Sequence, residues 1–519
     1  MSDLTALNAA RRSTDLAALG DAPHVDVVVI GGGITGAGIA LDAASRGLSV
    51  VLADKHDLAF GTSRWSSKLA HGGLRYLATG NVGIARRSAA ERGLLMTRNA
   101  PHLVSALPQL VPLLPSMSGR QRALVRVGFL AGDLLRALSG TSSSVLPRPR
   151  RIGRDEAVAM APTVRRDGLD GGLLAFDGQL IDDARLVVAV ARTAAQHGAR
   201  VLTRVGASAA TGSSVRLTDT LSGESVDVTA RVVINATGVW AGEVDTSIRL
   251  RPSRGTHLVL DSASFGNPTA ALTIPIPGET NRFVFALPAQ LGRVYVGLTD
   301  EEAPGPIPDV PEPTPAEVAF LLDTVNTAVQ TPLTTADVIG AYAGLRPLID
   351  VAGKEGRTSD LSRDHAVLES DAGMFSIVGG KLTEYRLMAQ DVLDRALPAR
   401  GVDDRPCRTG NLPLVGAPAN SVGALRTPAE IPRSLVARYG AESPTVIASA
   451  RCERPTDPVV EGIDVTRAEF EFAVTHEGAL DVADILDRRT RIGLVPADRD
   501  RAVAAAGEFV GAERTHGSG

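Results

Sequence analysis

A glycine-rich turn between two apolar runs constrains the fold of this chain more than any other feature. Val25–Ile30 is a β-branched run of the kind found in buried parallel strands. Gly31–Gly36 follows it with the pattern G-x-G-x-x-G, and a helix is predicted over Thr35–Arg46. A second strand is predicted over Leu48–Ala53. Strand, turn, helix and strand in this order predict one βαβ unit, as found in nucleotide-binding sheets.

An acidic residue completes the dinucleotide motif. The motif glycines permit a tight turn, a close approach of the backbone to a diphosphate and close packing of the helix on the strand. The start of the helix directs its N–H groups and positive dipole end at the diphosphate. Asp54 follows the second strand, where its carboxylate can accept both ribose hydroxyls and disfavours a 2′-phosphate. The predicted nucleotide site comprises Gly31, Gly33, Ile34, Thr35, Gly36 and Asp54.

The motif alone does not separate NAD from FAD, but two later segments favour FAD. Arg231–Asn235 is an apolar strand that ends in the small residues Ala236-Thr237-Gly238. Met374–Val378 is another strand, followed by the turn Gly379-Gly380 and a helix over Lys381–Leu397. The start of that helix suits the electron-rich end of a reduced flavin. Two glycine turns so far apart along the chain suit an elongated cofactor better than a compact one.

The chain is therefore predicted to have an α/β fold whose FAD-binding domain is Rossmann-like and discontinuous. Strand-like runs such as Thr256–Leu260 and Arg293–Leu298 predict an inserted mixed-sheet domain that faces the substrate and a membrane. The end of the chain lacks glycine-rich turns and predicts a helical domain. The expected bounds are residues 1–22 for an N-terminal arm, 23–100, 165–250 and 340–400 for the FAD-binding domain, 101–164 and 251–339 for the inserted domain, and 405–519 for the helical C-terminal domain.

Composition excludes several classes of protein. A net charge of −4 gives no support to nucleic acid as a partner, and 3% aromatic residues argue against base-stacking surfaces. The two cysteines lie outside any C-x-x-C motif, so we assign them no disulfide, metal or catalytic role. The segment Met1–Pro23 lacks the apolar core of a secretory signal, which favours a cytoplasmic location. We also expect no bilayer-spanning helix, because no apolar run of about 18 residues occurs.

One segment bears on a membrane surface. Gly119–Leu138 is predicted to form a basic amphipathic helix, in which four arginines alternate with apolar residues. Such a helix can lie on an anionic membrane. It can equally pack on its own domain, and the sequence leaves both alternatives open. The four arginines are Arg120, Arg122, Arg126 and Arg136.

Motifs along the chain resemble those of the FAD-dependent glycerol-3-phosphate dehydrogenases of the aerobic, quinone-linked type. The resemblance runs in order from about Val25 to Leu397, and the helical tail is also similar. It implies a flavoprotein fold of the glutathione reductase-like or D-amino-acid oxidase-like kind. The matching stretches are the first glycine motif, Ser66-Ser67-Lys68-Leu69, His71-Gly72-Gly73-Leu74-Arg75-Tyr76, Asn99-Ala100-Pro101-His102, Asp182-Asp183-Ala184-Arg185-Leu186, Asn235-Ala236-Thr237-Gly238, Gly344-Leu345-Arg346-Pro347-Leu348, Ser362-Arg363-Asp364 and Gly379-Gly380-Lys381-Leu382-Thr383-Glu384-Tyr385-Arg386.

The resemblance implies oxidation of sn-glycerol 3-phosphate to dihydroxyacetone phosphate, with hydride passing from C2 to flavin N5 and electrons then passing to a quinone. Arginine suits the substrate phosphate because its planar fork donates two hydrogen bonds at once. The implied catalytic residues are Arg75, Tyr76, Arg346, Arg363 and Lys381. The implied cofactor residues beyond the glycine motif are Thr62, Ser63, Ser67, Lys68, Leu69, Val205 near adenine, Ala236, Thr237, Gly238, Gly380, Lys381, Leu382 and Thr383.

The base that removes the C2 hydroxyl proton is a separate hypothesis. His257 has a suitable ordinary pKa of about 6.5, although a lone histidine is often structural. Arginine is effectively never deprotonated, so Arg346 is expected to be a clamp or to stabilise an oxyanion.

Several alternatives stay open at this point. The same half-reaction could pass electrons to oxygen, as in a glycerol-3-phosphate oxidase. A flavin oxidase of amines or amino acids is disfavoured by the arginine-rich motifs. A non-catalytic FAD-binding module at a membrane is disfavoured by the intact cationic residues. We expect a peripheral protein at the cytoplasmic face of the membrane, and a homodimer is open.

Overall fold

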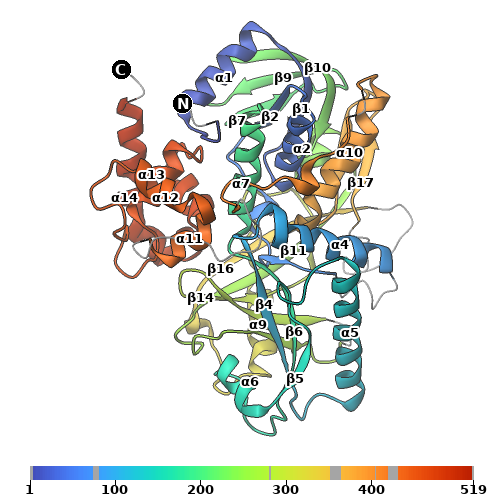
Figure 1. Ribbon diagram of the computed structural model, residues 1–519, viewed down its shortest axis with the longest axis vertical. Helices are drawn as coiled ribbons and strands as arrows, with labels where there is room; N and C mark the ends of the chain where they lie inside the picture. The colour runs from blue at the N-terminus through green and yellow to red at the C-terminus, as the bar shows by residue number, and fades with distance from the viewer. Residues whose placement is uncertain are drawn as a thin grey trace.

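The computed structural model describes residues 4–73, 81–279, 282–350, 364–403, 405–418 and 431–516. Figure 1 shows three parts: a sheet with flanking helices at the top, a second sheet below it, and a group of C-terminal helices at the side. The two sheets are joined through several crossings of the chain, so each is built from segments far apart in the sequence.

The upper sheet is a mainly parallel sheet with strand order β17-β18-β10-β1-β2-β7. Its strands β1, β2, β7, β10 and β18 all run parallel, and their carboxyl ends meet at one edge. An antiparallel hairpin, β8–β9, extends from β10. The bounds are β1 (His24–Ile30), β2 (Val50–Asp54), β7 (Arg200–Thr203), β8 (Val205–Ser208), β9 (Ser214–Asp219), β10 (Ser225–Asn235), β17 (Ala366–Glu369) and β18 (Phe375–Val378).

Alternation along β1 explains the two layers around this sheet. Val27 and Val29 pack in one core with the helices α2 (Ile34–Ser45), α7 (Asp183–Gln196) and α10 (Tyr385–Ala399). Val28 and Ile30 point to the other face, where the β8–β9 hairpin and the helix α1 (Ala9–Asp21) cover them. Burial on both faces is what a continuous β-branched run predicts.

The lower sheet has the strand order β15-β11-β14-β13-β12-β4-β6-β3, with β16 paired to β11 and β5 to β6. Its longest pairing joins β11 and β16 from Leu250↔Ile349 to Leu260↔Val338. The bounds are β3 (Leu69–Ala70), β4 (Val104–Pro112), β5 (Arg150–Ile152), β6 (Gly172–Leu180), β11 (Leu250–Asp261), β12 (Ala271–Pro275), β13 (Phe283–Ala289), β14 (Arg293–Gly297), β15 (Glu301–Glu302) and β16 (Val338–Ile349).

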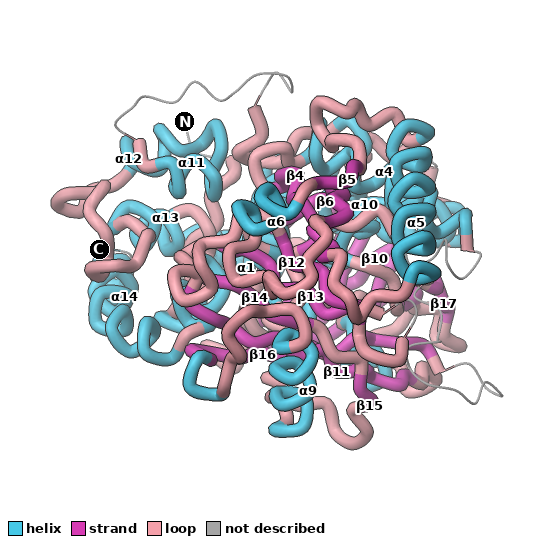
Figure 2. Tube along the Cα trace, turned by 90° about the horizontal axis from the view of Figure 1, so that it is seen from below, coloured by secondary structure: helices cyan, strands magenta, loops and turns pink. Residues whose placement is uncertain are grey.

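Helices flank the lower sheet. The helices α6 (Arg154–Met160) and α9 (Pro315–Asn326) bury apolar residues in the core of this sheet. The helix α4 (Val82–Leu94) lies between the two sheets, and α5 (Gly119–Leu138) packs beside it through Leu135. Figure 2 shows α5 at the periphery, on the side of the molecule away from the C-terminal helices.

The C-terminal helices form their own small cores and then dock on the rest of the chain. They are α11 (Arg433–Tyr439), α12 (Ser443–Ser449), α13 (Arg467–Thr475) and α14 (Pro496–His516), with a π-helix η9 (Asp484–Arg489) between α13 and α14. Figure 1 shows them beside both sheets. Among the described residues, no helix is long and apolar enough to cross a membrane.

The structure differs from the predicted domain bounds at four places. The strands β3 and β6 and most of β16 lie within residues predicted for the FAD-binding domain, but all three strands belong to the lower sheet. Short apolar strands give the same local signal in either sheet, and only pairing with distant strands decides which one they join. The predicted N-terminal arm contains α1, whose Leu19 is fully buried against the face of the upper sheet that the β8–β9 hairpin also covers.

Candidate functional site

The glycine turn brings three backbone segments together. A side chain at Gly31, where φ is 110°, would place its Cβ 2.7 Å from the Ala236 carbonyl oxygen. At Gly36 the Cβ would lie 1.8 Å from the Gly31 carbonyl oxygen. Ile34 N, at the start of α2, donates to Ser63 Oγ at 2.9 Å. The start of α2, the end of β10 and the segment around Ser63 therefore meet at the carboxyl edge of the sheet.

Asp54 lies at the same edge. Its Oδ2 accepts from Gly32 N at 2.6 Å and its Oδ1 from His56 N at 2.7 Å. Burial raises the pKa of Asp54, and the two backbone donors oppose that rise. A carboxylate, small residues and the N–H groups of a helix start fit the ribose and diphosphate of a dinucleotide.

Residues 62–68, here named the flavin loop, lie against the strands β11 and β16 of the lower sheet. Thr62 Oγ1 donates to the Leu345 carbonyl at 2.6 Å. Ser67 Oγ lies 2.8 Å from His257 Nε2, within hydrogen-bonding distance. A Cβ at Gly344 would lie 2.5 Å from that of Trp65, so glycine is needed for the loop to approach.

Two predicted cofactor residues have side chains that are buried inside the protein, one in an ion pair and one in an apolar core. Lys68 is 2% exposed, and its Nζ lies 3.1 Å from Asp183 Oδ2. Burial lowers the pKa of Lys68 to about 8. Val205, predicted near adenine, is 1% exposed within the core beneath the upper sheet. Because both side chains are buried within the protein, only the backbone of these two residues could contact a cofactor. The sequence alone does not show which side chains are buried in this way.

The remaining predicted cofactor residues lie in or next to β3, after β10 and after the second glycine turn. Leu69 begins β3, opposite Gln179 of β6. Ala236, Thr237 and Gly238 follow β10, and Thr237 Oγ1 donates to Asn235 Oδ1 at 2.7 Å. Leu382 and Thr383 lie in a short 3₁₀ helix after the second glycine turn. At Gly380, where φ is 80°, a Cβ would lie 2.5 Å from Met388 Sδ.

His257 lies on the face of β11 that the flavin loop covers. Its ring stacks on Tyr342 of β16, with the ring centroids 4.8 Å apart. Nδ1 has no hydrogen-bond partner within the described part of the chain. Burial, with the nearby charges of Lys68 and Arg346, lowers the pKa of His257 well below 6.5. The imidazole is therefore neutral at pH 7 and has a nitrogen that can serve as an acceptor.

Arg346 lies on the same face, because alternate residues of paired strands point the same way. It is paired across the strands with Ser253, to whose Oγ its Nη1 donates at 3.1 Å. Its Nη2 donates to the Thr299 carbonyl at 3.1 Å, and Nη1 lies 3.3 Å from Asp300 Oδ1. A Cβ at Gly255 would come within 2.2 Å of Nη2, so glycine makes room for this guanidinium.

Lys381 lies at the second glycine turn, facing α4. Its Nζ donates to Ser88 Oγ at 2.8 Å and to Glu384 Oε1 at 3.2 Å. Ser88 Oγ in turn donates to Glu384. The sequence did not identify Ser88, since a serine inside a helical segment gives no signal of a distant partner.

The predicted residues Arg75, Tyr76 and Arg363 lie outside the described residues. The turn that precedes Arg75 is described: Gly72 N donates to Asp177 Oδ1 at 3.0 Å. Arg92 Nη1 pairs with the same carboxylate at 2.7 Å. Sequence reasoning missed this buried pair, because neither residue belongs to a motif.

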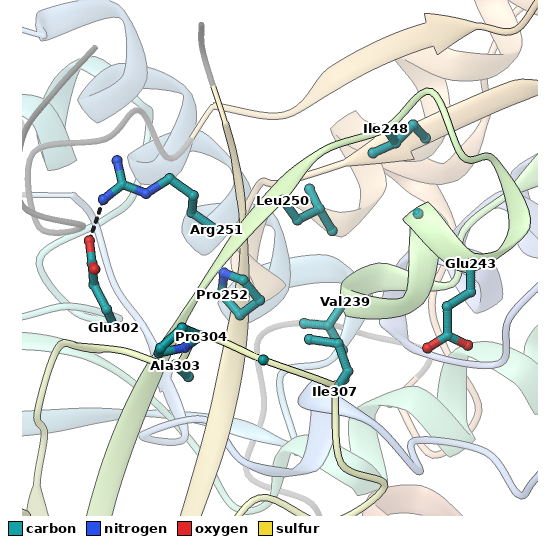
Figure 3. Close-up of a pocket in the computed structure, with 12 residues that line it drawn as sticks. Val239, Glu243, Ile248, Leu250, Arg251, Pro252, Glu302, Ala303, Pro304 and Ile307 are labelled. Atoms are coloured by element: carbon teal, nitrogen blue, oxygen red, sulfur yellow. Dashed lines mark hydrogen bonds and ion pairs between the residues drawn. The ribbon is translucent and has the colours of Figure 1, made fainter. Parts of the chain in front are cut away.

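A cavity of about 400 Å³ opens elsewhere, between the segment after β10 and the start of β11. Figure 3 shows apolar side chains such as Val239, Leu250 and Ile307 around it, with the ion pair of Arg251 and Glu302 at one edge. Of the predicted catalytic and cofactor residues that the structure describes, none lines it. The cavity is therefore distinct from the place where those described residues meet.

Comparison with known proteins gives two family models that match this chain. The model of FAD dependent oxidoreductases matches residues 26–386, and that of the C-terminal domain of alpha-glycerophosphate oxidase matches residues 407–514. Glycerol-3-phosphate dehydrogenase 1 of Mycobacterium tuberculosis is 73% identical over 97% of this chain and 98% of its own length. The aerobic glycerol-3-phosphate dehydrogenase of Staphylococcus aureus is 34% identical over 75% of this chain and 71% of its own.

A solved structure agrees with these matches. The glycerol-3-phosphate dehydrogenase of Bacillus halodurans, complexed with FAD, has a TM-score of 0.73 to this chain at 26% identity. The match covers 97% of this chain and 94% of that one. The predicted fold, the predicted cofactor FAD and the family resemblance are confirmed. The chain belongs to the family of FAD-dependent glycerol-3-phosphate dehydrogenases.

Proposed function

We propose that this protein oxidises sn-glycerol 3-phosphate to dihydroxyacetone phosphate with FAD, and passes the electrons to a membrane quinone. The observation that carries the proposal is the face shared by β11 and β16, where His257 and Arg346 lie beside the flavin loop. The names of the relatives support this choice of substrate. A neutral base and a fixed guanidinium are what an alcohol bearing a phosphate requires.

FAD would be held by its ADP half at Gly31–Gly36 and Asp54, and by its flavin half between the flavin loop and the turn at Gly380. Bound FAD supplies an acceptor for the hydride that leaves C2 of the substrate. The backbone N–H groups at the start of α2 then neutralise the diphosphate without a dedicated lysine or arginine.

His257 is proposed to accept the C2 hydroxyl proton at Nδ1. As C2 loses its hydride, the O–H bond breaks and the C=O bond forms, so the proton must leave to a neutral base. Burial keeps the imidazole neutral, and the contact of Ser67 with Nε2 fixes its orientation. General bases placed in this way typically contribute about 10²–10⁴-fold in rate.

Arg346 is proposed to bind the substrate phosphate or the developing oxyanion. Its guanidinium is already held by Ser253, Thr299 and Asp300, so little conformational freedom is lost when a ligand binds. Lys381 is proposed to add a second cation from the second glycine turn, where Ser88 and Glu384 hold it. Arg75, Tyr76 and Arg363 are proposed to complete this site.

Contact with a membrane is proposed for α5. Its outward face carries a stripe of five apolar residues, each 50–64% exposed, while Val125 and Phe129 on its other side pack on the lower sheet. Arg120 and Arg126 are exposed on the same helix, which suits an anionic membrane. The five residues, named the α5 stripe, are Leu124, Val127, Leu130, Leu134 and Leu138.

An anaerobic titration tests the proposed reaction. Addition of glycerol 3-phosphate to the FAD-bound protein should bleach the flavin absorbance, and a soluble quinone analogue should restore it faster than air does. A flavin that stays oxidised would refute the substrate. Rapid recovery in air with production of hydrogen peroxide would instead favour an oxidase and refute the quinone as acceptor.

A further inference from the structure

The side chains of three arginines of the C-terminal domain contact buried groups of the FAD-binding domain. Arg488 and Arg489 belong to η9, and Arg491 follows two residues later. Arg488 Nε donates to Asp57 Oδ2 at 2.6 Å, and Arg489 donates to both oxygens of Asp57 at 2.7 and 2.8 Å. All three arginines are at most 3% exposed. Buried pairs of this kind resist rearrangement, because breaking one leaves an uncompensated buried charge.

Arg491 is the residue that reaches the flavin loop itself. Its Nη2 donates to the Arg64 carbonyl oxygen at 2.5 Å, while its Nε donates to Asp182 Oδ2 at 3.1 Å. Lys68 Nζ donates to the same Arg64 carbonyl at 3.0 Å. Two buried cations, one from each end of the chain, thus share one backbone oxygen.

The backbone of both cations is also unusual. Arg491 has φ 63° and Lys68 has φ 55°, in the left-handed region that non-glycine residues rarely adopt. Such conformations persist where surrounding contacts enforce them, and they concentrate at functional sites. The pair of outliers marks the Arg64 carbonyl as a point where the position of the loop is closely determined.

The flavin loop connects this point to the proposed base within three residues. Ser66 N and Oγ donate to Asp183 Oδ2 at 2.9 and 2.7 Å, and the next residue, Ser67, contacts His257. The guanidinium of Arg491 also lies over the Trp65 ring, 5.3 Å from its centroid. A displacement at the Arg64 carbonyl would therefore be carried along the short loop to the contact between Ser67 and His257.

We propose that Arg491 is a positioning residue, which holds the flavin loop so that Ser67 orients His257 for proton acceptance. The inference rests on the proposed function and assigns part of the active-site framework to the C-terminal domain. Arg491 does not act on the substrate itself. It acts through the Arg64 carbonyl and Asp182, two acceptors that a planar guanidinium can contact at once and an ammonium on a lysine stem cannot.

The substitution Arg491→Lys in the full-length, FAD-bound protein tests this. The charge is kept, so the chain should still fold and retain FAD. The rate of anaerobic flavin reduction by glycerol 3-phosphate should fall by about 10- to 100-fold, because small misplacements of catalytic groups have effects of this size. The KM should change much less than kcat, and amide hydrogens of residues 62–68 should exchange faster with deuterium.

Arg438→Lys is the matched control. Arg438 is equally buried in the C-terminal domain, but its partners Glu469 and Asp464 belong to the same domain. This variant should lower stability without changing the flavin reduction rate or the exchange of residues 62–68. A reduction rate in Arg491→Lys equal to that of the unaltered protein would overturn the proposal, and so would equal losses of rate in the two variants.

The exchange measurement separates this proposal from the proposed function. If glycerol 3-phosphate fails to bleach the unaltered protein, the substrate is wrong, yet the exchange of residues 62–68 still reports whether Arg491 holds the loop. If the unaltered protein is bleached but exchange is the same in Arg491→Lys, the positioning role alone is refuted.

Discussion

The two ends of the cofactor site are built in different ways. The ADP end is built mainly from one stretch, Gly31 to Asp54, against which the end of β10 and Ser63 pack. Each of its contacts has a backbone group on at least one side, and close approach depends on glycines. The substrate end gathers the flavin loop, β11, β16 and the turn at Gly380, and it depends on buried ion pairs and side-chain hydrogen bonds. Because of the close steric contacts at the ADP end, substitutions there should abolish FAD binding. Substitutions at the substrate end should lower the reaction rate and leave FAD bound.

The largest effect is expected at the ADP end. In Gly36→Ala, the new Cβ would meet the Gly31 carbonyl oxygen at 1.8 Å, a backbone atom that cannot move aside without opening the turn. The purified variant should therefore lack flavin absorbance. Gly83→Ala is the control, since nothing lies within 4 Å of its Cβ and it should remain yellow. A Gly36→Ala protein with full FAD content would show that steric contacts at the ADP end do not control FAD binding, which would contradict the difference expected between the two ends.

At the substrate end, His257→Gln should lower kcat by about 10²–10⁴-fold with FAD still bound. The pKa of His257 is lowered well below 6.5, so activity should fall only as the pH drops through that lowered value and the imidazole becomes charged. The acid limb of kcat/KM should lie below pH 6.5 and be absent from the glutamine variant.

A matched substitution checks this result. His24 is exposed at the start of β1 and contacts Thr229, so His24→Gln should leave the pH profile unchanged. An acid limb that persists in His257→Gln would assign the proton to another group.

The next largest effect is expected for Arg346→Ala, which should lower kcat/KM by about 10²–10³-fold. A loss of this size is usual when one donor to a developing oxyanion is removed. It also removes the pair with Asp300. Steady-state kinetics and the ratio of flavin to protein are the measurements. Arg346→Lys should recover part of the loss, because charge remains but the two-pronged contact does not. Release of FAD from Arg346→Ala would contradict a role confined to the substrate end.

The smallest effect on the reaction is expected at the α5 stripe, which lies away from both ends. Leu130→Asp and Leu134→Asp should weaken binding to vesicles that contain anionic lipid by at least about tenfold, since each buried apolar side chain is worth about 1.5–3 kcal/mol. Flavin reduction by glycerol 3-phosphate should not change. Leu221→Asp, a substitution of similar exposure in the upper domain, should bind vesicles normally. Unaltered binding of both stripe variants would exclude α5 as the contact.

The same contrast explains what the sequence could predict. The βαβ unit and the bounds of α5 follow from local periodicity and turn chemistry, and the structure confirms both. Motif resemblance supplied Arg346, and the ordinary pKa of histidine suggested His257, but the two were predicted only as separate residues. That they share one face follows from the pairing of β11 with β16, which joins segments nearly a hundred residues apart.

The buried contacts of Lys68, Lys381 and Arg491 could not be predicted from local sequence patterns, for a physical reason. The ammonium of Lys68 is bound by Asp183, and Lys381 is held by Ser88 of α4. Arg491 belongs to a different domain from the loop that it contacts. Each of these contacts joins distant segments through buried charge, and neither composition nor spacing records such pairs. For the same reason, the predicted domain bounds did not place β6 and β16 in the lower sheet.

The position of Arg488 and Arg489 late in the chain has a consequence for synthesis on the ribosome. Asp57 emerges early, together with the glycine turn, but both of its cationic partners emerge more than four hundred residues later. Until then the carboxylate must stay hydrated, because burying it without a partner would cost several kcal/mol. We therefore expect the nascent FAD-binding domain to keep Asp57 accessible to water until the C-terminal helices dock.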